Sequence, residues 1–304
     1  MVIKMILKNI DTALDYVKYC SAIKKLKEEF SFLKTEVIGK SVLGKNIYAL
    51  KIGKGYDSVL FAAAFHGSEH ITTNISLMLC EKICMSLLTD SPLCDINLKR
   101  ALKGRGIIIL PRVNPDGCDI SILGAAGAAR ADYLVRKLCE GDYRHYNANA
   151  RGVDINHNFP AGWETLRAME KSHGILGPAA TRFGGFSPIS EPETAALVSL
   201  CRSENIAHVL ALHTQGEVIY WNYGDKTPKK SQKMAEIMAA VSGYSLDVPV
   251  KLATGGGFKD YFIEEFSRPG FTIELGLGQN PLNEKNVGKI YKKAEEMLIL
   301  SAIM

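Results

Sequence analysis

The stretch VLFAAAFHGSEH, residues 59–70, decides the fold of this chain. Its apolar first part is typical of a buried strand, and Gly67 interrupts it. Residues 75–88 then have the composition of a helix. Strand, turn and helix in this order predict an α/β fold.

His66 and Glu69 lie three positions apart across the same turn. Side chains with that spacing can point at one spot, and an imidazole with a carboxylate supplies two of the three protein ligands of a catalytic zinc site. The pattern is short, so a structural alternative stays open. In that alternative, His66 ends the strand and Glu69 is a first-turn acid favoured by the helix dipole.

The composition favours a globular protein and argues against nucleic-acid-binding and membrane-spanning proteins. The chain has 304 residues, of which 47% are hydrophobic, and this is enough for a substantial core. Its net charge of +5 comes without any block of like charges, which argues against a nucleic-acid partner. No apolar stretch approaches eighteen residues and no signal-like segment opens the sequence, so we expect no membrane span. Seven cysteines without a CxxC pair indicate reduced thiols and a cytoplasmic location.

The remaining pattern alternates between strands and helices. The first 34 residues place apolar side chains at helical spacing, residues 36–52 are typical of an edge hairpin, and residues 106–110 form a strand. Such alternation favours a mixed, mostly parallel sheet between two helical layers. We therefore predict a three-layer αβα domain over residues 35–304, preceded by an N-terminal helical extension over residues 1–34.

Three stretches lack a regular pattern. Residues 114–117 have the composition of a turn, and residues 151–160 crowd polar groups in a way that suggests a site. Residues 162–189 contain five glycines and two prolines and are predicted to form a long functional loop. Ser190 is then expected to cap a helix, with Glu193 as its reciprocal acceptor.

Two further strands carry chemically useful side chains at their ends, His213 and Glu274. Ligands of open α/β sheets bind beyond the carboxyl ends of the strands, so we expect His213 to meet His66 and Glu69 there. We predict one zinc ion per chain on these three residues, with Glu274 taking a proton from water and passing it to the leaving amine. Asp154 is predicted to accept a hydrogen bond from the far nitrogen of His66.

Five motifs occur along the chain in a fixed order: His66-Gly67-Ser68-Glu69, Asn114-Pro115-Asp116-Gly117, residues 152–158, the strand end at His213, and Thr272-Ile273-Glu274-Leu275. In this order the sequence resembles the zinc carboxypeptidase family typified by carboxypeptidase A. The resemblance implies zinc on His66, Glu69 and His213, Glu274 as general base and acid, and a mixed sheet of about eight strands.

Residues 149–154, 190–194, 213–221 and 256–261 are similar to one bacterial branch of that family, the γ-D-glutamyl-meso-diaminopimelate peptidases. The resemblance implies an amide bond of a peptidoglycan stem peptide, or muramyl peptide, as the substrate.

The sequence also departs from the family pattern. An arginine that grips the terminal carboxylate of the substrate follows the asparagine in the family, whereas this chain has Asn156-His157. The family's carbonyl-polarising arginine falls near Asn147, and Arg151 and Arg144 are candidates to replace it. Ordinary trimming of protein C-termini is therefore disfavoured.

Lys259 follows three glycines at the start of a helix, and it would supply a cation for the second carboxylate of diaminopimelate. The substrate-binding residues are thus predicted to be Asn156, His157, Arg151 and Lys259. For Lys259 and His157 the alternative is a solvated helix residue and a packed histidine.

Several functional alternatives stay open. His66, Glu69 and His70 fit the H-x-x-E-H pattern, but that chemistry requires one continuous helix, and Gly67 argues against it. The others are an ordinary metallocarboxypeptidase, an inactive relative that binds peptidoglycan peptides, and a deacylase of small acyl-amino acids. The sequence gives no oligomeric state.

Overall fold

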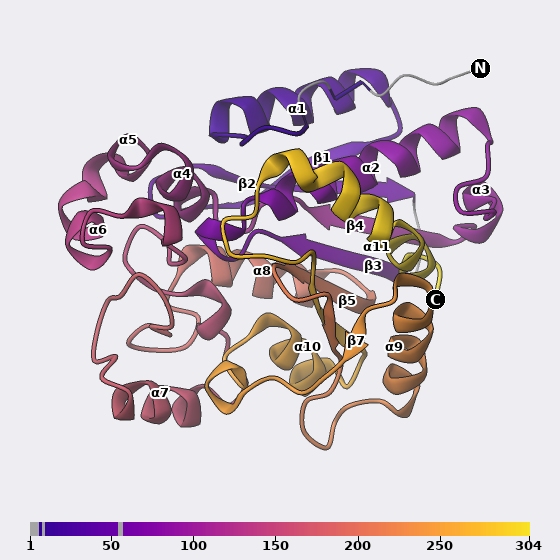
Figure 1. The fold of residues 1–304 in the computed structure, drawn as a ribbon. Coiled ribbons are helices and arrows are strands. Elements are labelled where there is room, and N and C mark those ends of the chain that lie inside the picture. Colours follow the sequence, from indigo (N-terminus) through magenta and orange to yellow (C-terminus); the bar gives the residue numbers. More distant parts are fainter. Residues whose placement is uncertain (1–5, 8–9, 54–56) are drawn as a thin grey trace.

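A single eight-stranded sheet forms the centre of the computed structural model, which describes residues 6–7, 10–53 and 57–304 (Figure 1). Its strands follow the order β1-β2-β4-β3-β5-β8-β6-β7. Their bounds are β1 Lys34–Lys40, β2 Asn46–Gly53, β3 Asp57–Ala63, β4 Arg105–Leu110, β5 Ile206–His213, β6 Val218–Tyr220, β7 Ser245–Leu246 and β8 Gly270–Glu274. The four central strands β4, β3, β5 and β8 run parallel. The pairs β1–β2, β2–β4 and β6–β8 are antiparallel, and β7 pairs parallel with β6. The predicted mixed α/β sheet is confirmed.

Helices cover both faces of the sheet. Their bounds are α1 Tyr16–Glu29, α2 Ile71–Thr89, α3 Leu98–Ala101, α4 Pro115–Leu123, α5 Ala125–Ala128, α6 Asp132–Leu138, α7 Trp163–Ser172, α8 Pro192–Ser203, α9 Lys229–Ser242, α10 Phe258–Phe266 and α11 Val287–Ser301. Figure 1 shows α1, α2 and α11 on one face of the sheet and α8 and α10 on the other.

Alternating side chains of the central strands divide the core in two. Phe61 of β3 and Leu210 of β5 pack with α1, α2 and α11, whereas Leu60 and Val209 pack with α8 and α10. This alternation is the period of two that a pleated strand imposes. Because both faces are covered, β3 is buried from Ser58 and apolar from Val59 to its end, as expected for a central parallel strand.

The N-terminal segment packs on the main core. Tyr19 and Leu26 of α1 are fully buried in the cluster that also contains α2 and α11. The buried guanidinium of Arg112 donates to the carbonyl of Leu14 and lies over the Tyr19 ring. Residues 1–5, 8 and 9 of the predicted extension lie outside the described residues, and a separate extension over residues 1–34 stays a prediction.

Two regions differ from their predicted form. Residues 114–117 begin helix α4, because Asn114 accepts a hydrogen bond from the Gly117 amide at 2.8 Å and proline is tolerated in a first helical turn. The predicted loop over residues 162–189 contains helix α7. Glycines precede and follow this helix in the sequence, and for this reason its short amphipathic pattern was not recognised as helical.

The capping prediction at Ser190 is wrong. Glu191 is the N-cap of α8, and the Ser190 hydroxyl donates to the Glu191 carboxylate at 2.9 Å. The Glu193 carboxylate turns inward and accepts from the Val42 amide at 3.1 Å and from Asn149 at 3.2 Å. Partners distant in sequence therefore override the local capping pattern.

Helix α2 is long and apolar enough to cross a membrane, with a mean hydropathy of 1.3. However, 78% of that window is buried inside the protein. Contacts with β3, β4 and α11 place this helix in the core of the protein.

Candidate active site

Two parallel strands deliver histidines to the same edge of the sheet. His66 follows β3, and the 3-10 turn Gly67–Glu69 carries the carboxylate back beside it. His213 is the last residue of the neighbouring strand β5. A side chain at position 67 would collide with the carbonyl oxygens of Gly117 and Tyr146, so this close approach requires glycine.

Glu69 bridges the two histidines. Its Oε1 lies 2.9 Å from His66 Nδ1, and its Oε2 lies 3.0 Å from His213 Nδ1. One ligand atom from each of these residues lies within 4.8 Å of the other two, an arrangement that could hold a metal ion. Two imidazole nitrogens and one carboxylate are the donor set of catalytic zinc sites with an open fourth position. The three side chains therefore fit zinc.

The protonation of this cluster reflects its burial. Burial by itself would raise the pKa of Glu69, but His66 and His213 outweigh it and lower that pKa to about 2. Burial disfavours the His66 cation, yet the charges of Glu69 and Asp154 raise the His66 pKa well above its usual value. Glu69 is therefore ionised, as a metal ligand must be, and metal binding at His66 would release a proton.

Asp154 lies behind His66. Its Oδ1 is 3.2 Å from His66 Nε2, on the far side of the ring from Glu69. The amides of Asn156 and Arg182 donate to the two oxygens of Asp154, at 3.1 and 2.8 Å. The carboxylate is thus fixed from the backbone, and it can hold the His66 ring in one orientation.

Sequence reasoning missed Asn280 and Thr214. The Thr214 amide donates to Glu69 Oε2 at 3.2 Å, and the Asn280 amide group donates to the Thr214 carbonyl at 2.8 Å and lies 3.5 Å from Glu69 Oε1. These contacts help to fix the position of the Glu69 carboxylate. No local pattern marks Asn280, because its partners lie more than sixty positions away.

Glu274 ends β8 beside His213. The two residues are register partners on parallel strands, so their side chains leave the same face of the sheet. Burial and the negative charge of Glu69 raise the pKa of Glu274 well above its usual value, against the opposing influence of His66. An acid is thereby placed next to the His66, Glu69 and His213 cluster.

The predicted substrate-binding residues already have partners within the protein. Asn156 Oδ1 accepts from the Phe258 amide at 2.9 Å, which ties it to the start of α10. His157 Nδ1 lies 2.8 Å from Glu170 Oε1. The Lys259 ammonium is 2.9 Å from the Asn222 carbonyl and also contacts Asp260.

Both arginines considered as replacements at Asn147 are paired. Arg151 lies 3.6 Å from Glu191, and Arg144 donates two hydrogen bonds to Asp142, at 3.0 and 2.9 Å. Asn147 itself accepts from the Ser68 hydroxyl at 2.5 Å, so it lies directly beside the turn that carries Glu69.

His70 stays outside the metal cluster. Its ring is buried, with Nδ1 3.5 Å from Glu284, and it precedes helix α2. His66 and Glu69 lie before that helix rather than on it. The single-helix H-x-x-E-H arrangement is therefore absent from the described part of the chain.

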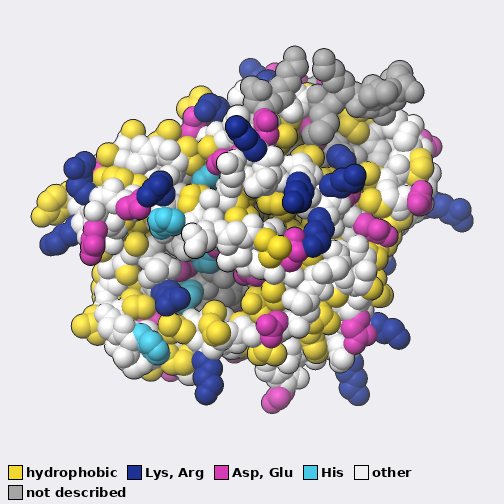
Figure 2. Space-filling view, in the orientation of Figure 1, with side chains coloured by type: hydrophobic (Ala, Val, Ile, Leu, Met, Phe, Trp, Pro, Cys, Tyr) yellow, Lys and Arg dark blue, Asp and Glu magenta, His cyan; other side chains and the backbone are white. Residues whose placement is uncertain are grey.

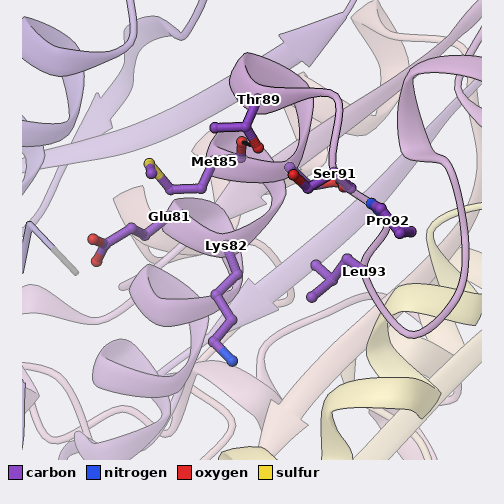
Figure 3. Close-up of a pocket in the computed structure, with 8 residues that line it drawn as sticks. Glu81, Lys82, Met85, Thr89, Ser91, Pro92 and Leu93 are labelled. Carbon is purple, nitrogen blue, oxygen red and sulfur yellow. Dashed lines mark hydrogen bonds between the residues drawn. The ribbon is translucent and has the colours of Figure 1, made fainter. Parts of the chain in front are cut away.

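Figure 2 shows the surface hollowed near its centre, with histidine side chains along one side of the hollow. A different pocket, of about 170 Å³, lies beside the second half of α2 (Figure 3). Its charged groups are already engaged, since Glu81 accepts from the Leu7 amide and Lys82 pairs with Glu295. The strand-end cluster is therefore the stronger candidate for an active site.

Comparison with known proteins agrees with this geometry. The model of a family described as zinc carboxypeptidase matches residues 19–298. The chain is 36% identical to gamma-D-glutamyl-L-diamino acid endopeptidase 1 of Lysinibacillus sphaericus over 283 residues, which cover 92% of this chain and 70% of that protein. It is 35% identical over 280 residues to the uncharacterized protein YqgT of Bacillus subtilis (strain 168), covering 91% of this chain and 73% of that one.

A solved structure shares the fold. Carboxypeptidase A from Helicoverpa armigera superposes with a TM-score of 0.72 at 21% identity, covering 99% of this chain and 76% of that one. At this identity the likeness concerns the fold alone.

Proposed function

The chain belongs to the zinc carboxypeptidase family and is a zinc-dependent peptidase, and on that premise we propose that it cleaves the amide bond between γ-D-glutamate and diaminopimelate in peptidoglycan stem peptides. One observation carries the choice of substrate. The Lysinibacillus sphaericus relative is named for γ-D-glutamyl-L-diamino acid cleavage, and the likeness to it extends over 92% of this chain.

The site can serve amide hydrolysis with the residues present. Zinc bound by His66, Glu69 and His213 would supply a Lewis acid and lower the pKa of a water molecule. His66 would be neutral in that state, donating from Nε2 to Asp154 and leaving the lone pair of Nδ1 for the metal.

Glu274 is the proposed general base and acid. It would take a proton from the attacking water and give it to the leaving amine, and the step is compatible with its position beside His213. Burial and the charge of Glu69 raise the pKa of Glu274, which makes its carboxylate a stronger base. A cation held by His66, Glu69 and His213 would offset the charge of Glu69 and so favour the ionised form of Glu274 that accepts the proton.

Diaminopimelate carries more charged groups than an ordinary C-terminal residue. Diaminopimelate brings a second carboxylate and an ammonium, and Lys259 with Asp260 places opposite charges side by side near the start of α10. We propose that Lys259 receives the distal carboxylate, and that Asn156, His157 and Arg151 contact the remaining polar groups. A substrate carboxylate would then join an existing ion pair.

We further propose a cytoplasmic location, which would direct the enzyme to recycled wall fragments or to wall material made during development. Seven free cysteines support this proposal. The substrate itself would be a soluble muramyl or stem peptide.

The experiment that tests the proposal is a product analysis. Zinc-loaded protein is incubated with L-Ala-γ-D-Glu-diaminopimelate and, separately, with α-linked peptides ending in Phe or Leu, and the products are identified by mass. Release of diaminopimelate with poor cleavage of the α-linked peptides supports the proposal. Efficient release of Phe or Leu alone would instead indicate an ordinary carboxypeptidase, the second candidate, which is compatible with the zinc carboxypeptidase family match.

A further inference from the structure

A second segment runs alongside the stretch that carries Asp154. The Asp154 amide donates to the Phe183 carbonyl at 2.7 Å, and the Arg182 amide donates back to Asp154 Oδ2 at 2.8 Å. Asp154 Oδ1 lies 3.2 Å from His66. One carboxylate therefore separates the backbone of Arg182 from the ring of a proposed metal ligand.

The backbone of Arg182 is held in an uncommon conformation. Its φ is +65°, in the left-handed region that side chains other than glycine rarely adopt. Such conformations persist where surrounding contacts fix them, and they cluster at functional sites. Here the bond to Asp154 fixes the amide, and Phe183 next to it is buried.

The guanidinium of Arg182 is exposed and unpaired. No acidic or carbonyl group of residues 6–7, 10–53 or 57–304 lies within ion-pair or hydrogen-bond distance of its side chain. Two other cations, both predicted to bind substrate, have acidic partners. Arg151 pairs with Glu191, and Lys259 pairs with Asp260.

Arg167, whose guanidinium lies over the ring of Phe183, is also neutralised. It pairs with Glu170, which also contacts His157. Of the four cations Arg151, Arg167, Lys259 and Arg182, only Arg182 has no acidic partner among the described residues. A guanidinium fork matches a carboxylate with two parallel hydrogen bonds, which an imidazole such as His157 cannot make.

We propose that Arg182 binds a carboxylate of the substrate and thereby sets the specificity of the site for acidic peptides. This inference rests on the proposed function, because a γ-D-glutamyl-diaminopimelate bond has carboxylates on both sides. The α-carboxylate of D-glutamate and the carboxylates of diaminopimelate share the chemistry that Arg182 recognises. Arg182 acts here by binding and takes no part in proton transfer.

The test measures binding separately from turnover. Arg182→Gln and Arg182→Lys are made in a Glu274→Gln background, where the peptide stays intact, and the Kd of L-Ala-γ-D-Glu-diaminopimelate is measured by calorimetry. Arg202→Gln is the matched control, since Arg202 is an exposed arginine on α8 that pairs with Glu265. We expect Arg182→Gln to weaken binding about 10- to 100-fold, Arg182→Lys to weaken it less, and Arg202→Gln to leave it unchanged.

Modified peptides identify the carboxylate. One peptide carries an amidated D-glutamate α-carboxyl group, one replaces diaminopimelate with lysine, and one has an amidated main-chain carboxyl group at its C-terminal residue. The peptide that lacks the recognised carboxylate should bind the parent and Arg182→Gln equally. An unchanged Kd in Arg182→Gln, or an equal loss of affinity with the unmodified peptide and with all three modified peptides, would overturn the inference.

The proposed function and this inference fail in different ways. If the unmodified enzyme releases no diaminopimelate, the proposed function fails. If it releases diaminopimelate while kcat/KM is the same in Arg182→Gln, only the role of Arg182 fails. Circular dichroism of each variant confirms that the comparison is made between folded proteins.

Discussion

His213 and Glu274 are register partners at the carboxyl ends of the parallel strands β5 and β8. Parallel pairing puts both side chains on the same face of the sheet, so a histidine of the candidate metal cluster and a carboxylate lie next to each other without any specialised loop. The rigid central sheet sets the relation between metal ligand and base. The loops around the sheet then determine which substrate binds.

Replacing Glu274 with Gln removes the proposed base while keeping the size of the side chain. We expect zinc content and folding to be retained and kcat to fall by about 10²- to 10⁴-fold, because an amide cannot accept the proton of water. Glu217→Gln is the control, since Glu217 pairs with Lys293 at the surface. Steady-state kinetics would contradict the assignment if Glu274→Gln kept its turnover and Glu217→Gln lost it.

Replacing His213 with Ala removes one of three proposed ligands. Stoichiometric zinc binding should be lost, because two remaining side chains leave the ion under-coordinated. Metal analysis after dialysis measures this directly, and His173→Ala, at an exposed histidine after α7, serves as control. Equal zinc content in the parent and His213→Ala would place the metal elsewhere.

Asp154→Asn tests the support behind His66. The amide cannot match the charge of the carboxylate 3.2 Å from His66 Nε2, so zinc affinity should fall about 10- to 100-fold. Chelator competition gives the affinity. Asp142→Asn removes a surface carboxylate that pairs with Arg144, and it should leave zinc affinity unchanged.

The strand ends of the site could be predicted from sequence because buried parallel strands have continuous apolar sequences. His66 and His213 each follow such a run, and the sheet brings the ends of neighbouring parallel strands together. The number of strands was expected from the family resemblance, which rested on the order of the five motifs. The match to the zinc carboxypeptidase model confirms that resemblance.

Side-chain partners from distant segments could not be predicted in the same way. The contact of Arg182 with Asp154 joins residues 28 positions apart, and Asn280 meets Thr214 across 66 positions. Local pattern carries no signal for either contact. Lys259 illustrates the same limit, because its pairing with Asp260 and Asn222 depends on the packing of α10 against a loop.

Stability should fall at acidic pH through His208. Burial lowers the pKa of His208 from its usual 6.5 to about 4, although a contact of 2.7 Å from its Nε2 to the Ser301 carbonyl opposes this. The unfolded chain therefore binds a proton between pH 6.5 and 4 that the folded chain does not. His208 contributes stability above pH 6.5 that is lost as the pH falls towards 4, by up to about 3 kcal/mol.

Chemical denaturation between pH 4 and 7 measures this contribution. His208→Gln keeps a donor for Ser301 but cannot titrate, so its free energy of unfolding should depend less steeply on pH than that of the parent. The exposed His173→Gln variant should keep the parental slope. Parallel curves for the parent and His208→Gln would show that His208 does not titrate differently in the two states.

Substrate preference should depend on the Lys259 and Asp260 pair. Replacing Lys259 with Met leaves the buried Asp260 carboxylate without its cation, although the Gly255 amide still donates to it at 2.7 Å. Loss of the cation should raise KM for diaminopimelate-ended peptides more than for lysine-ended ones, because only the former carry the distal carboxylate. A double variant, Lys259→Met with Asp260→Asn, removes the unpaired charge and separates loss of recognition from loss of folding. If the double variant regains both stability and the parental preference for diaminopimelate, Lys259 serves the packing of α10 and the distal carboxylate is bound elsewhere.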